Sequence, residues 1–419
     1  MRSTLPQLAP HLRLGWQWPQ ALRSLRHRNF RLFFFGQLIS LTGSWMQTTA
    51  QQWLVYRITA SQLSLGTVTF INFLPVLLLS LFMGVLVDRF PRRTLLVFTQ
   101  TGFTLLAAIL ALLTWTGVVE YWHILVLAGL FGIANALDMP ARQAFFSDMV
   151  PRDELFNAIA LNSSVFNGAR ILGPAIGGFV VAAFGEAPAF GLNAASYLAV
   201  IGALLMMRLP PRSEPADRQR GLGQLRQGLR YLASDRRLLG LVTMIALFSL
   251  VGFPFTVLMP VFASDILGIG ASGLGGLLAA MGVGALAAAL SLAVLGDRQT
   301  KGPLLFVMRL LFAGALAGFS LSQSVFLSMT MLAVAGFALI TQLAVTNTLI
   351  QLIVADGLRG RVLSAYTWAL GGFWPLGSLL IGWGGDQLGA PTVVLLSAIG
   401  SAVLAVLGRV WFPAERLLT

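Results

Sequence analysis

The stretch GVLVDRFPRR, residues 84–93, sets one acid and three arginines between two long apolar runs. Asp88 and Arg89 open the charged segment, and Arg92 and Arg93 close it. The apolar runs on either side are each about 25 residues long, which is enough for a helix to cross a hydrocarbon core of about 30 Å. The stretch therefore indicates a very short polar turn between two membrane-spanning helices.

The composition of the whole chain agrees with a lipid environment. It has 419 residues, of which 57% are hydrophobic and 10% are charged, and its mean hydropathy is +0.80. Soluble domains carry about 25% charged residues, so this chain has too little polar surface for water. Only helices and closed barrels span lipid, and the apolar runs here are longer than the strands of about ten residues that build a barrel. We expect an all-α membrane protein.

Twelve apolar segments of about 20 residues or more follow one another along the chain. They lie at residues 31–56, 63–87, 94–118, 122–147, 157–184, 188–208, 238–264, 272–296, 303–322, 326–350, 362–385 and 391–412. We therefore predict twelve transmembrane helices in two six-helix bundles. The predicted parts are a tail at 1–30, a bundle at 31–208, a linker at 209–237, and a second bundle with a short tail at 238–419.

Nearly all of the 28 Lys and Arg residues lie on one side of this arrangement, in the two tails, the linker and alternate turns. On the other side the sequence places Arg57. The positive-inside rule assigns the basic side, and with it both termini, to the cytoplasm. The net charge of +13 is therefore a topology signal, and no nucleic-acid partner is expected.

The two predicted bundles repeat one another. Glycines and charges recur after 209 residues in the first part of each half and after 204 residues in the second part. The matched pairs are Gly66 and Gly275, Asp88 and Asp297, Arg89 and Arg298, Gly168 and Gly372, Gly173 and Gly377, and Gly178 and Gly382. Two halves in the same orientation form a parallel repeat, which is an architecture of secondary transporters.

Four segments together resemble the major facilitator superfamily. They are GVLVDRFPRR (84–93), GSWMQTTAQQWLVYRITAS (43–61), PARQAFFSDMVPRDELFNA (140–158) and ARILGPAIGG (169–178). The first is similar to the signature turn G-x-x-x-D-R-x-G-R-R, with Pro91 in place of a glycine. The other three resemble the exporter subgroup that includes the enterobactin exporter and macrolide efflux proteins. The resemblance implies an inner-membrane secondary transporter whose single cavity opens to each side in turn.

The resemblance also assigns the charged turn to gating. The expected gating residues are Gly84, Asp88, Arg89, Arg92 and Arg93, together with Asp148 and the poorer second copy, Asp297 and Arg298. A carboxylate at position 88 can meet the positive N-terminus of a neighbouring helix, which the family places near Ser364 in the outward-open state. Either Arg92 or Arg93 can reach Asp148. The alternative is that these charges only anchor helix ends.

In this superfamily the spans predicted at 31–56, 122–147, 238–264 and 326–350 line the cavity. Polar or apolar side chains recur at helical spacing on three of them. The expected cavity residues are Gln37, Ser44, Gln47, Gln51, Phe248, Phe255, Met259, Gln342, Thr346 and Asn347. They suit an amphiphilic substrate, with neutral donors and flexible apolar walls. The alternative is that the aromatic stripe serves packing alone.

Charged side chains also fall deep inside two predicted spans. Asp138 lies about 15 Å from the end of its span near Asp148, and Arg142 follows at i+4 on the same face. Arg170 lies at comparable depth in the next span. Charges in lipid are costly and mark functional sites. We expect the three to meet, with Asp138 as a proton carrier or, alternatively, as half of a permanent ion pair.

The sequence lacks the motifs that ATP-driven pumps, membrane proteases and zinc enzymes require. There is no G-x-x-x-x-G-K-[ST] loop for ATP and no cysteine, and the three histidines are too few and too scattered for a protease or a zinc enzyme. We expect no enzyme activity, cofactor or metal. The prediction is a monomeric, proton-driven exporter of an amphiphilic drug or siderophore in a bacterial inner membrane. Uptake, lipid flipping and a non-transporting receptor of the same fold are the alternatives.

Overall fold

The computed structural model describes residues 20–209, 230–295 and 301–411, and in these ranges it contains helices and no strands. The helices before the linker are η1 (Gln20–Arg26), α1 (Arg28–Thr59), α2 (Gln62–Arg89), α3 (Arg92–Trp115), α4 (Tyr121–Met149), η2 (Arg152–Glu154), α5 (Leu155–Phe184) and α6 (Glu186–Met206). Those after it are α8 (Arg236–Val251), η3 (Phe253–Leu258), α9 (Met259–Val261), η4 (Phe262–Ile266), α10 (Gly270–Leu295), α11 (Lys301–Leu321), α12 (Val325–Ile353), η6 (Asp356–Leu358), α13 (Arg359–Leu388) and α14 (Ala390–Trp411).

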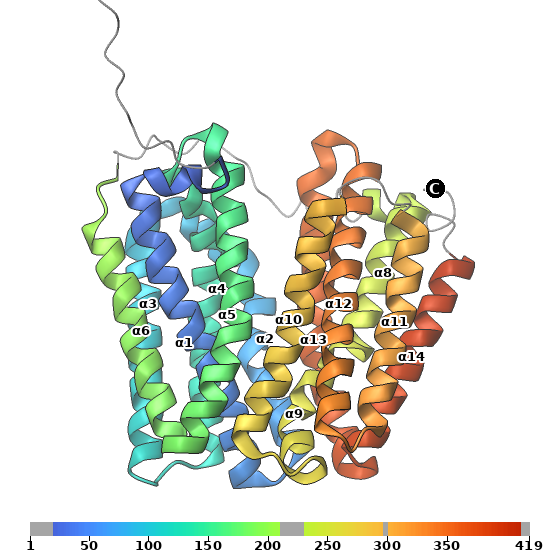
Figure 1. The fold of residues 1–419 in the computed structure, drawn as a ribbon. Helices are drawn as coiled ribbons and strands as arrows, with labels where there is room; N and C mark the ends of the chain where they lie inside the picture. The colour runs from blue at the N-terminus through green and yellow to red at the C-terminus, as the bar shows by residue number, and fades with distance from the viewer. Residues whose placement is uncertain (1–19, 210–229, 296–300, 412–419) are drawn as a thin grey trace, which may run out of the picture.

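The long helices stand side by side in two groups. Figure 1 shows α1–α6, coloured blue to green, as one group and α8–α14, coloured yellow to red, as the other. We call them the N-terminal and C-terminal halves. Most of the predicted linker lies outside the described residues, so its limits and those of the two predicted bundles stay predictions.

Ten helical segments of the described chain are long and apolar enough to cross a membrane. They do not include α1 and α13, which have 32 and 30 residues and stand along the other helices (Figure 1). Polar side chains such as Gln37 and Gln47 lower the hydropathy of α1. The all-α membrane fold is confirmed, whereas the count of twelve spans and the cytoplasmic position of the termini stay predictions.

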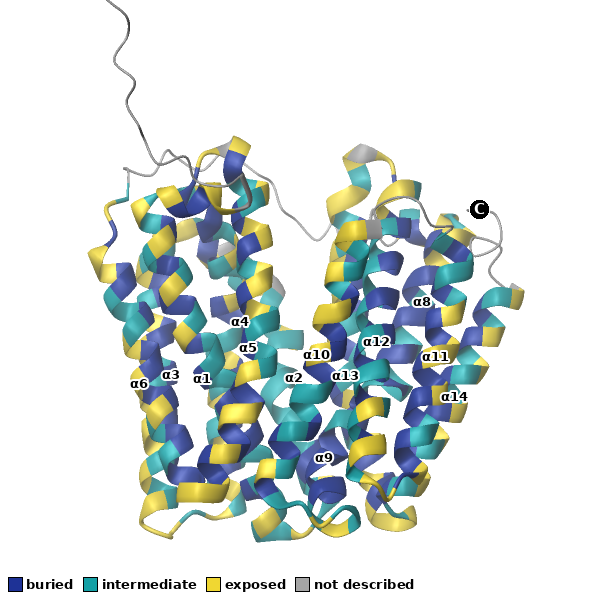
Figure 2. Cartoon of the chain, in the orientation of Figure 1, coloured by how far each residue is buried: buried dark blue, intermediate teal, exposed yellow. Residues whose placement is uncertain are grey.

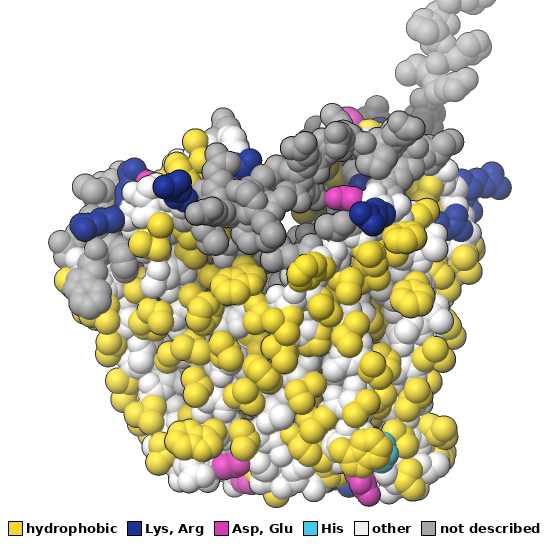
Figure 3. All heavy atoms as spheres, turned by 180° about the vertical axis from the view of Figure 1, so that it is seen from behind, with side chains coloured by type: hydrophobic (Ala, Val, Ile, Leu, Met, Phe, Trp, Pro, Cys, Tyr) yellow, Lys and Arg dark blue, Asp and Glu magenta, His cyan; other side chains and the backbone are white. Residues whose placement is uncertain are grey.

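The surface of the molecule is banded. Buried residues lie where helices face one another, and exposed ones lie on the outer faces (Figure 2). Apolar side chains cover the middle of the face in Figure 3, and Lys and Arg gather along its upper edge. We call the end that carries Arg28, Arg92 and Arg236 the basic end, and the end that carries Thr59 and Gln62 the opposite end.

The span predicted at 238–264 is not one continuous α-helix. α8 ends at Val251, and a 3-10 segment, a single α-helical turn and a π-helical segment carry the chain to Ile266. Pro254 and Pro260 lie in this irregular part, where each lacks the backbone N–H that the helix ladder needs. The whole run Arg236–Ile266 nevertheless has the length and hydropathy of a span.

The two halves touch through α2 against α13 and through α5 against α10. Both contacts require glycine. A Cβ on Gly66 would lie 2.2 Å from the carbonyl oxygen of Ser378, and one on Gly178 would lie 2.6 Å from that of Ala271. Both distances are shorter than van der Waals contact, so a side chain at either position would push the halves apart. These approaches lie in the parts of α2 and α5 that are nearer the opposite end.

The absence of cysteine lets single cysteines report the orientation directly. Val118 and Phe156 are exposed side chains next to helix ends at the opposite end and the basic end, respectively. We expect Val118→Cys to react with an impermeant maleimide in intact cells and Phe156→Cys to react only after permeabilisation, because the arginine-rich end stays in the cytoplasm. Reaction of Phe156→Cys in intact cells, with Val118→Cys protected, would reverse the orientation.

Candidate functional site

Asp138 is buried inside the N-terminal half, with an exposed fraction of 3%. Its Oδ1 accepts hydrogen bonds from Thr99 Oγ1 at 2.7 Å and Gln100 Nε2 at 2.9 Å, both on α3. Its Oδ2 accepts two from Arg142, from Nε at 2.9 Å and from Nη2 at 2.5 Å. The pairing with Arg142 follows the predicted i,i+4 spacing, whereas the two partners on α3 were not identified from the sequence.

Pro140 stands between the two charges of this pair. It has no N–H to donate to the carbonyl of Ala136, yet α4 continues to Met149. The Asp138–Arg142 ion pair spans the turn that holds the proline. It therefore stabilises α4 where the backbone ladder lacks one bond.

Arg170 does not join this pair in the structure. It lies in the middle of α5, and in the described chain its guanidinium donates no hydrogen bond; its Nη2 is buried without an acceptor. The backbone carbonyl of Arg170 lies against Gly282 of α10, 3.3 Å from where a Cβ there would be. The expected meeting of three charges is thus corrected to one ion pair and a separate arginine. At this level the backbone of α5 packs against α10.

The polar stripe on α1 faces α6. The Ser44 Oγ and Tyr197 OH atoms are 3.1 Å apart, and Gln47 Oε1 accepts a hydrogen bond of 2.7 Å from Asn193 Nδ2. Gln37 is buried, and neither atom of its amide has a partner. The structure therefore places Ser44 and Gln47 in contacts within the N-terminal half, where helix periodicity alone could not assign the neighbour.

The apolar stripe predicted to line the cavity packs inside the C-terminal half. Phe248 is 6% exposed, and Phe255 and Met259 are fully buried. The rings of Phe248 and Phe255 lie 5.0 Å and 6.0 Å from the ring of Phe312, between centroids. These residues are therefore core residues in this structure, as in the packing alternative, and their role as cavity walls stays a prediction.

The polar residues predicted on α12 differ in their exposure. Gln342 and Thr346 are buried, and the Gln342 Nε2 atom has no partner. Asn347 is half-buried and accepts a hydrogen bond from Gln351 of the same helix. Gln51 on α1 is also half-buried. Contact of these side chains with a substrate stays a prediction.

The charged turn at the basic end is as short as its sequence indicates. α2 ends at Arg89 and α3 begins at Arg92, so two residues, Phe90 and Pro91, connect them. Pro91 precedes the first residue of α3 with a φ of −60°, a position where proline is compatible with the start of a helix. This explains how proline can stand where the family signature has glycine.

The arginines after the turn bind neighbouring helix ends. Arg92 Nη1 donates hydrogen bonds to Asp148 Oδ1 at 2.6 Å and to the carbonyl oxygen of Ala144 at 2.9 Å, both on α4. Arg93 Nη2 donates to the carbonyl oxygen of Leu205 on α6 at 2.8 Å. The turn thus joins α3 to α4 and α6, and of the two arginines expected to reach Asp148 it is Arg92 that does so.

For the other predicted gating residues on α2, the structure gives the exposure of the side chain or the space around it. Asp88 is half-buried and Arg89 is exposed at the end of α2, and Gly84 has open space where a side chain would project. The contact of Asp88 with α13 near Ser364 stays a prediction. Asp297 and Arg298 lie outside the described residues.

At the opposite end, a carboxylate of the C-terminal half caps a helix of the N-terminal half. Asp386, near the end of α13, accepts hydrogen bonds from the backbone N of Gln62 at 2.6 Å and of Leu63 at 3.1 Å. It also accepts one of 2.8 Å from the hydroxyl of Ser61, the N-cap residue of α2. Sequence reasoning missed this contact, because helix-end acids are common and their partners depend on tertiary packing.

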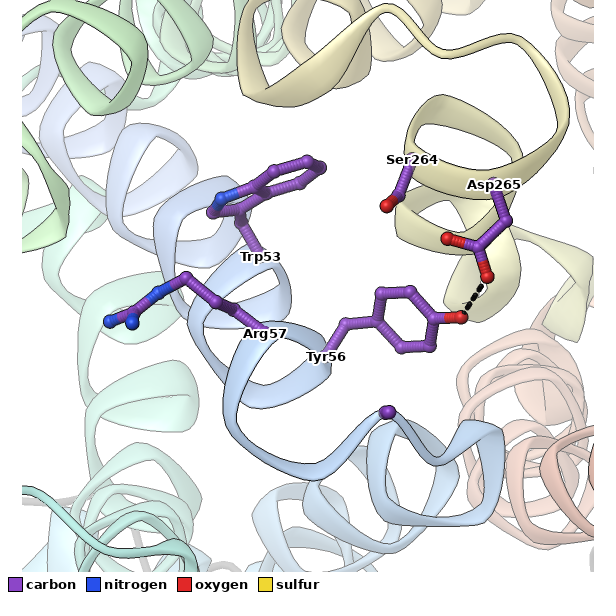
Figure 4. Close-up of a pocket in the computed structure, with 6 residues that line it drawn as sticks. Trp53, Tyr56, Arg57, Ser264 and Asp265 are labelled. Atoms are coloured by element: carbon purple, nitrogen blue, oxygen red, sulfur yellow. Dashed lines mark hydrogen bonds between the residues drawn. The ribbon is translucent and has the colours of Figure 1, made fainter.

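Next to this cap, α1 and η4 form a pocket of about 330 Å³ between the halves. Its lining residues are Trp53, Tyr56, Arg57, Ala60, Ser264 and Asp265. In Figure 4 the Tyr56 hydroxyl points to the Asp265 carboxylate, to which it donates a hydrogen bond, while the Arg57 side chain extends away from them. The pocket is therefore crossed by a second hydrogen bond that joins the halves at the opposite end.

Two further buried charges were not singled out from the sequence. Arg309 lies buried on α11. Glu186 is buried at the start of α6 and accepts a hydrogen bond of 2.6 Å from Arg57 Nε. Both charges lie among apolar residues in the sequence. A charge in such an apolar stretch is the one feature by which the sequence could have identified them.

The chain matches the family described as transmembrane secretion effector over residues 20–414. It is 27% identical over 395 residues to the staphyloferrin A transporter of Staphylococcus aureus (strain NCTC 8325 / PS 47), covering 92% of this chain and 96% of that protein. It is 26% identical over 401 residues to the multidrug efflux pump Tap of Mycolicibacterium fortuitum, with coverage of 92% and 96%.

Two solved transporters share the fold. A bacterial homologue of the human lysosomal transporter Spinster aligns with a TM-score of 0.71 at 15% identity, covering 93% of this chain and 96% of that chain. The nucleoside transporter NupG aligns with a TM-score of 0.69 at 15% identity, covering 92% and 98%. The predicted resemblance is confirmed, and these relatives are transporters, not enzymes. Because the family match spans nearly the whole sequence, the protein belongs to the transmembrane secretion effector family of major facilitator transporters.

Proposed function

We propose that the protein is a monomeric exporter of an amphiphilic small molecule, driven by the proton gradient across a bacterial inner membrane. Its family and its relatives, which include a staphyloferrin A transporter and a multidrug efflux pump, support transport of this kind. The mechanism is alternating access, in which the two halves rock about a central site.

The observation that carries alternating access is the closure of the halves at one end. At the opposite end, Asp386 caps α2, Tyr56 binds Asp265, and the backbone of Ser378 rests on Gly66. Toward the basic end the ribbons of the two halves diverge (Figure 1). A conformation that is closed on one side is one state of such a cycle, and here the closed side is the predicted outer side.

The Asp386 cap is weak enough to break in every cycle. Asp386 is exposed, and a carboxylate at an exposed helix N-terminus contributes about 0.3–1 kcal/mol. A cap of this strength biases the position of the halves without fixing it. At Gly66 the halves meet glycine against backbone, and Phe73 of α2 packs on Trp374 of α13 with 4.6 Å between ring centroids.

Proton coupling is assigned to Asp138. It is the one carboxylate that the described chain places in the interior of a spanning helix, and its Oδ2 is held by Arg142. The Arg142 side chain is 21% exposed and that of Asp138 is 4% exposed. We place the proton on Asp138 in a state where bending of α4 at Pro140 draws Arg142 away.

Transport itself is tested in inverted membrane vesicles. In inverted vesicles the basic end faces the medium, so an exporter moves its substrate into the lumen. We expect vesicles that contain the protein to accumulate members of a panel of fluorescent amphiphiles and siderophores when respiration makes their lumen acidic. Accumulation should stop when a protonophore collapses the gradient. Accumulation that survives the protonophore contradicts proton coupling, and accumulation confined to right-side-out vesicles assigns uptake instead of export.

Asp138→Asn separates coupling from folding. We expect this variant to reach the membrane and to exchange substrate between two equal pools, but to lose gradient-driven accumulation, because the amide cannot carry a proton. Glu120→Gln, which alters an acid at the opposite end, is the control and should behave as wild type. Full gradient-driven transport by Asp138→Asn excludes it as the carrier. If the variant fails to fold and Asp138→Asn with Arg142→Gln restores folding, the pair is structural.

Asp386→Asn should loosen the closed end. Ser378→Cys is the reporter, since Ser378 is buried under Gly66. We expect Asp386→Asn to raise the rate at which an impermeant maleimide labels Ser378→Cys by about two- to fivefold, which corresponds to loss of a helix-end contact. Glu120→Gln, whose parent carboxylate bonds within its own half, should leave the rate unchanged. An equal rate in both variants would show that the cap does not hold the halves.

A further inference from the structure

Arg170 lies where both halves of the protein meet. It precedes Gly173 and Gly177, which pack on α1, by three and seven residues, so it shares their face of α5. Its own carbonyl and the side chain of Ile171 lie against Gly282 of α10. Arg170 is therefore at the junction of α1, α5 and α10, near the middle of a spanning helix.

No carboxylate of the described chain neutralises this guanidinium. Asp138 is fully engaged by Arg142, Thr99 and Gln100. The other described acids lie at or near helix ends, at positions 88, 120, 148, 153, 154, 186, 235, 265, 356 and 386. A charge at mid-membrane depth is costly unless it is paired or hydrated, and the buried Nη2 atom of Arg170 has no acceptor in the protein.

An aromatic pair lies beside Arg170 on the side of the basic end. Phe166, four residues earlier and hence on the same face of α5, is 43% exposed. Its ring packs edge-on against Trp45 of α1, with 5.8 Å between centroids. A cation with unused donors and a partly exposed aromatic surface thus occur one helical turn apart.

We propose that Arg170 and the Trp45–Phe166 pair form a recognition site for anionic amphiphiles. The guanidinium binds an oxyanion group, such as a carboxylate, sulfonate or phosphate, through paired N–H donors. The two rings contact the apolar body of the same molecule. This inference rests on the proposed function, because the occupant is taken to be a molecule that the transporter moves. It adds that this molecule is an anion.

The test compares two probes that differ in one charge. Dansylglycine carries a carboxylate, and its methyl ester has the same aromatic body without the charge. The full chain is placed in nanodiscs of phosphatidylcholine, and binding is followed by dansyl fluorescence. We expect wild type to bind the acid roughly tenfold or more tightly than the ester, as for a hydrogen-bonded charge pair.

The variants assign this preference to particular side chains. Arg170→Ala and Arg170→Gln should bind acid and ester equally, and Arg170→Lys should keep a smaller preference, because an ammonium lacks the planar pair of donors. Phe166→Ala should weaken both probes by a similar factor. Arg409→Ala removes a charge that lies over the Phe306 ring, 4.6 Å from its centroid, and should leave the preference unchanged.

A lipid headgroup offers the same chemistry as a transported anion, and a second set of nanodiscs with phosphatidylglycerol separates the two. Loss of the acid preference in these discs assigns the site to the lipid, and its persistence assigns it to the transported molecule.

Two results would overturn the inference. One is a wild-type protein that does not prefer the acid, a measurement that needs no variant to fold. The other is a preference that survives in both Arg170→Ala and Arg170→Gln. The assay uses no proton gradient, so a failure here leaves export intact, and a failure of gradient-driven transport leaves this binding result intact.

Discussion

The interior of a bilayer offers no water to polar groups, and this constraint shapes the whole molecule. Each backbone N–H and C=O must be satisfied inside its own segment, which is why the described chain is built from long helices. Each polar side chain inside those helices needs a partner from the protein. Asp138 obtains its partners from α3 and α4, and the polar stripe of α1 obtains two of its own from α6.

The same constraint divides strong contacts from weak ones. Inside the N-terminal half, removal of one partner of the Asp138–Arg142 pair would leave the other charge without its counter-ion, and the loss for a fully buried pair is about 3–5 kcal/mol. Between the halves, the contacts at the opposite end involve an exposed carboxylate and glycine against backbone. The halves also meet through the Phe73–Trp374 ring pair and the Tyr56–Asp265 hydrogen bond, and the proposed rocking motion has to separate all of these contacts.

Local sequence rules predicted contacts within one helix or across one short turn. The i,i+4 pair of Asp138 and Arg142 follows from helix geometry, and of the two arginines expected to reach Asp148 the structure shows Arg92 in contact with it. The membrane fold and the family followed from hydropathy and from motifs in order. Each of these signals is read along the sequence and needs no knowledge of how distant helices pack.

Local sequence rules could not predict which helices pack against one another when they are distant in the sequence. The spacing of Phe248 and Phe255 identified one helical face but not whether that face meets a cavity or α11. Depth along α5 placed Arg170 level with Asp138, but depth says nothing of which neighbours a helix faces, and the structure packs this part of α5 against α1 and α10. The cap by Asp386 depends on α13 lying beside α2, two helices separated by more than 260 residues.

The separation of Asp138 from Arg170 limits how a proton and a substrate can influence each other. If they shared one site, each would displace the other directly. Here the carboxylate is enclosed by α3 and α4 within one half, while the free guanidinium lies on α5 where that half meets α10. A direct electrostatic effect would also favour simultaneous binding, because a proton on Asp138 adds positive charge that attracts an anion to Arg170. In the proposed export cycle, exchange of one for the other would therefore come from the position of the halves, with each ligand favouring a different state.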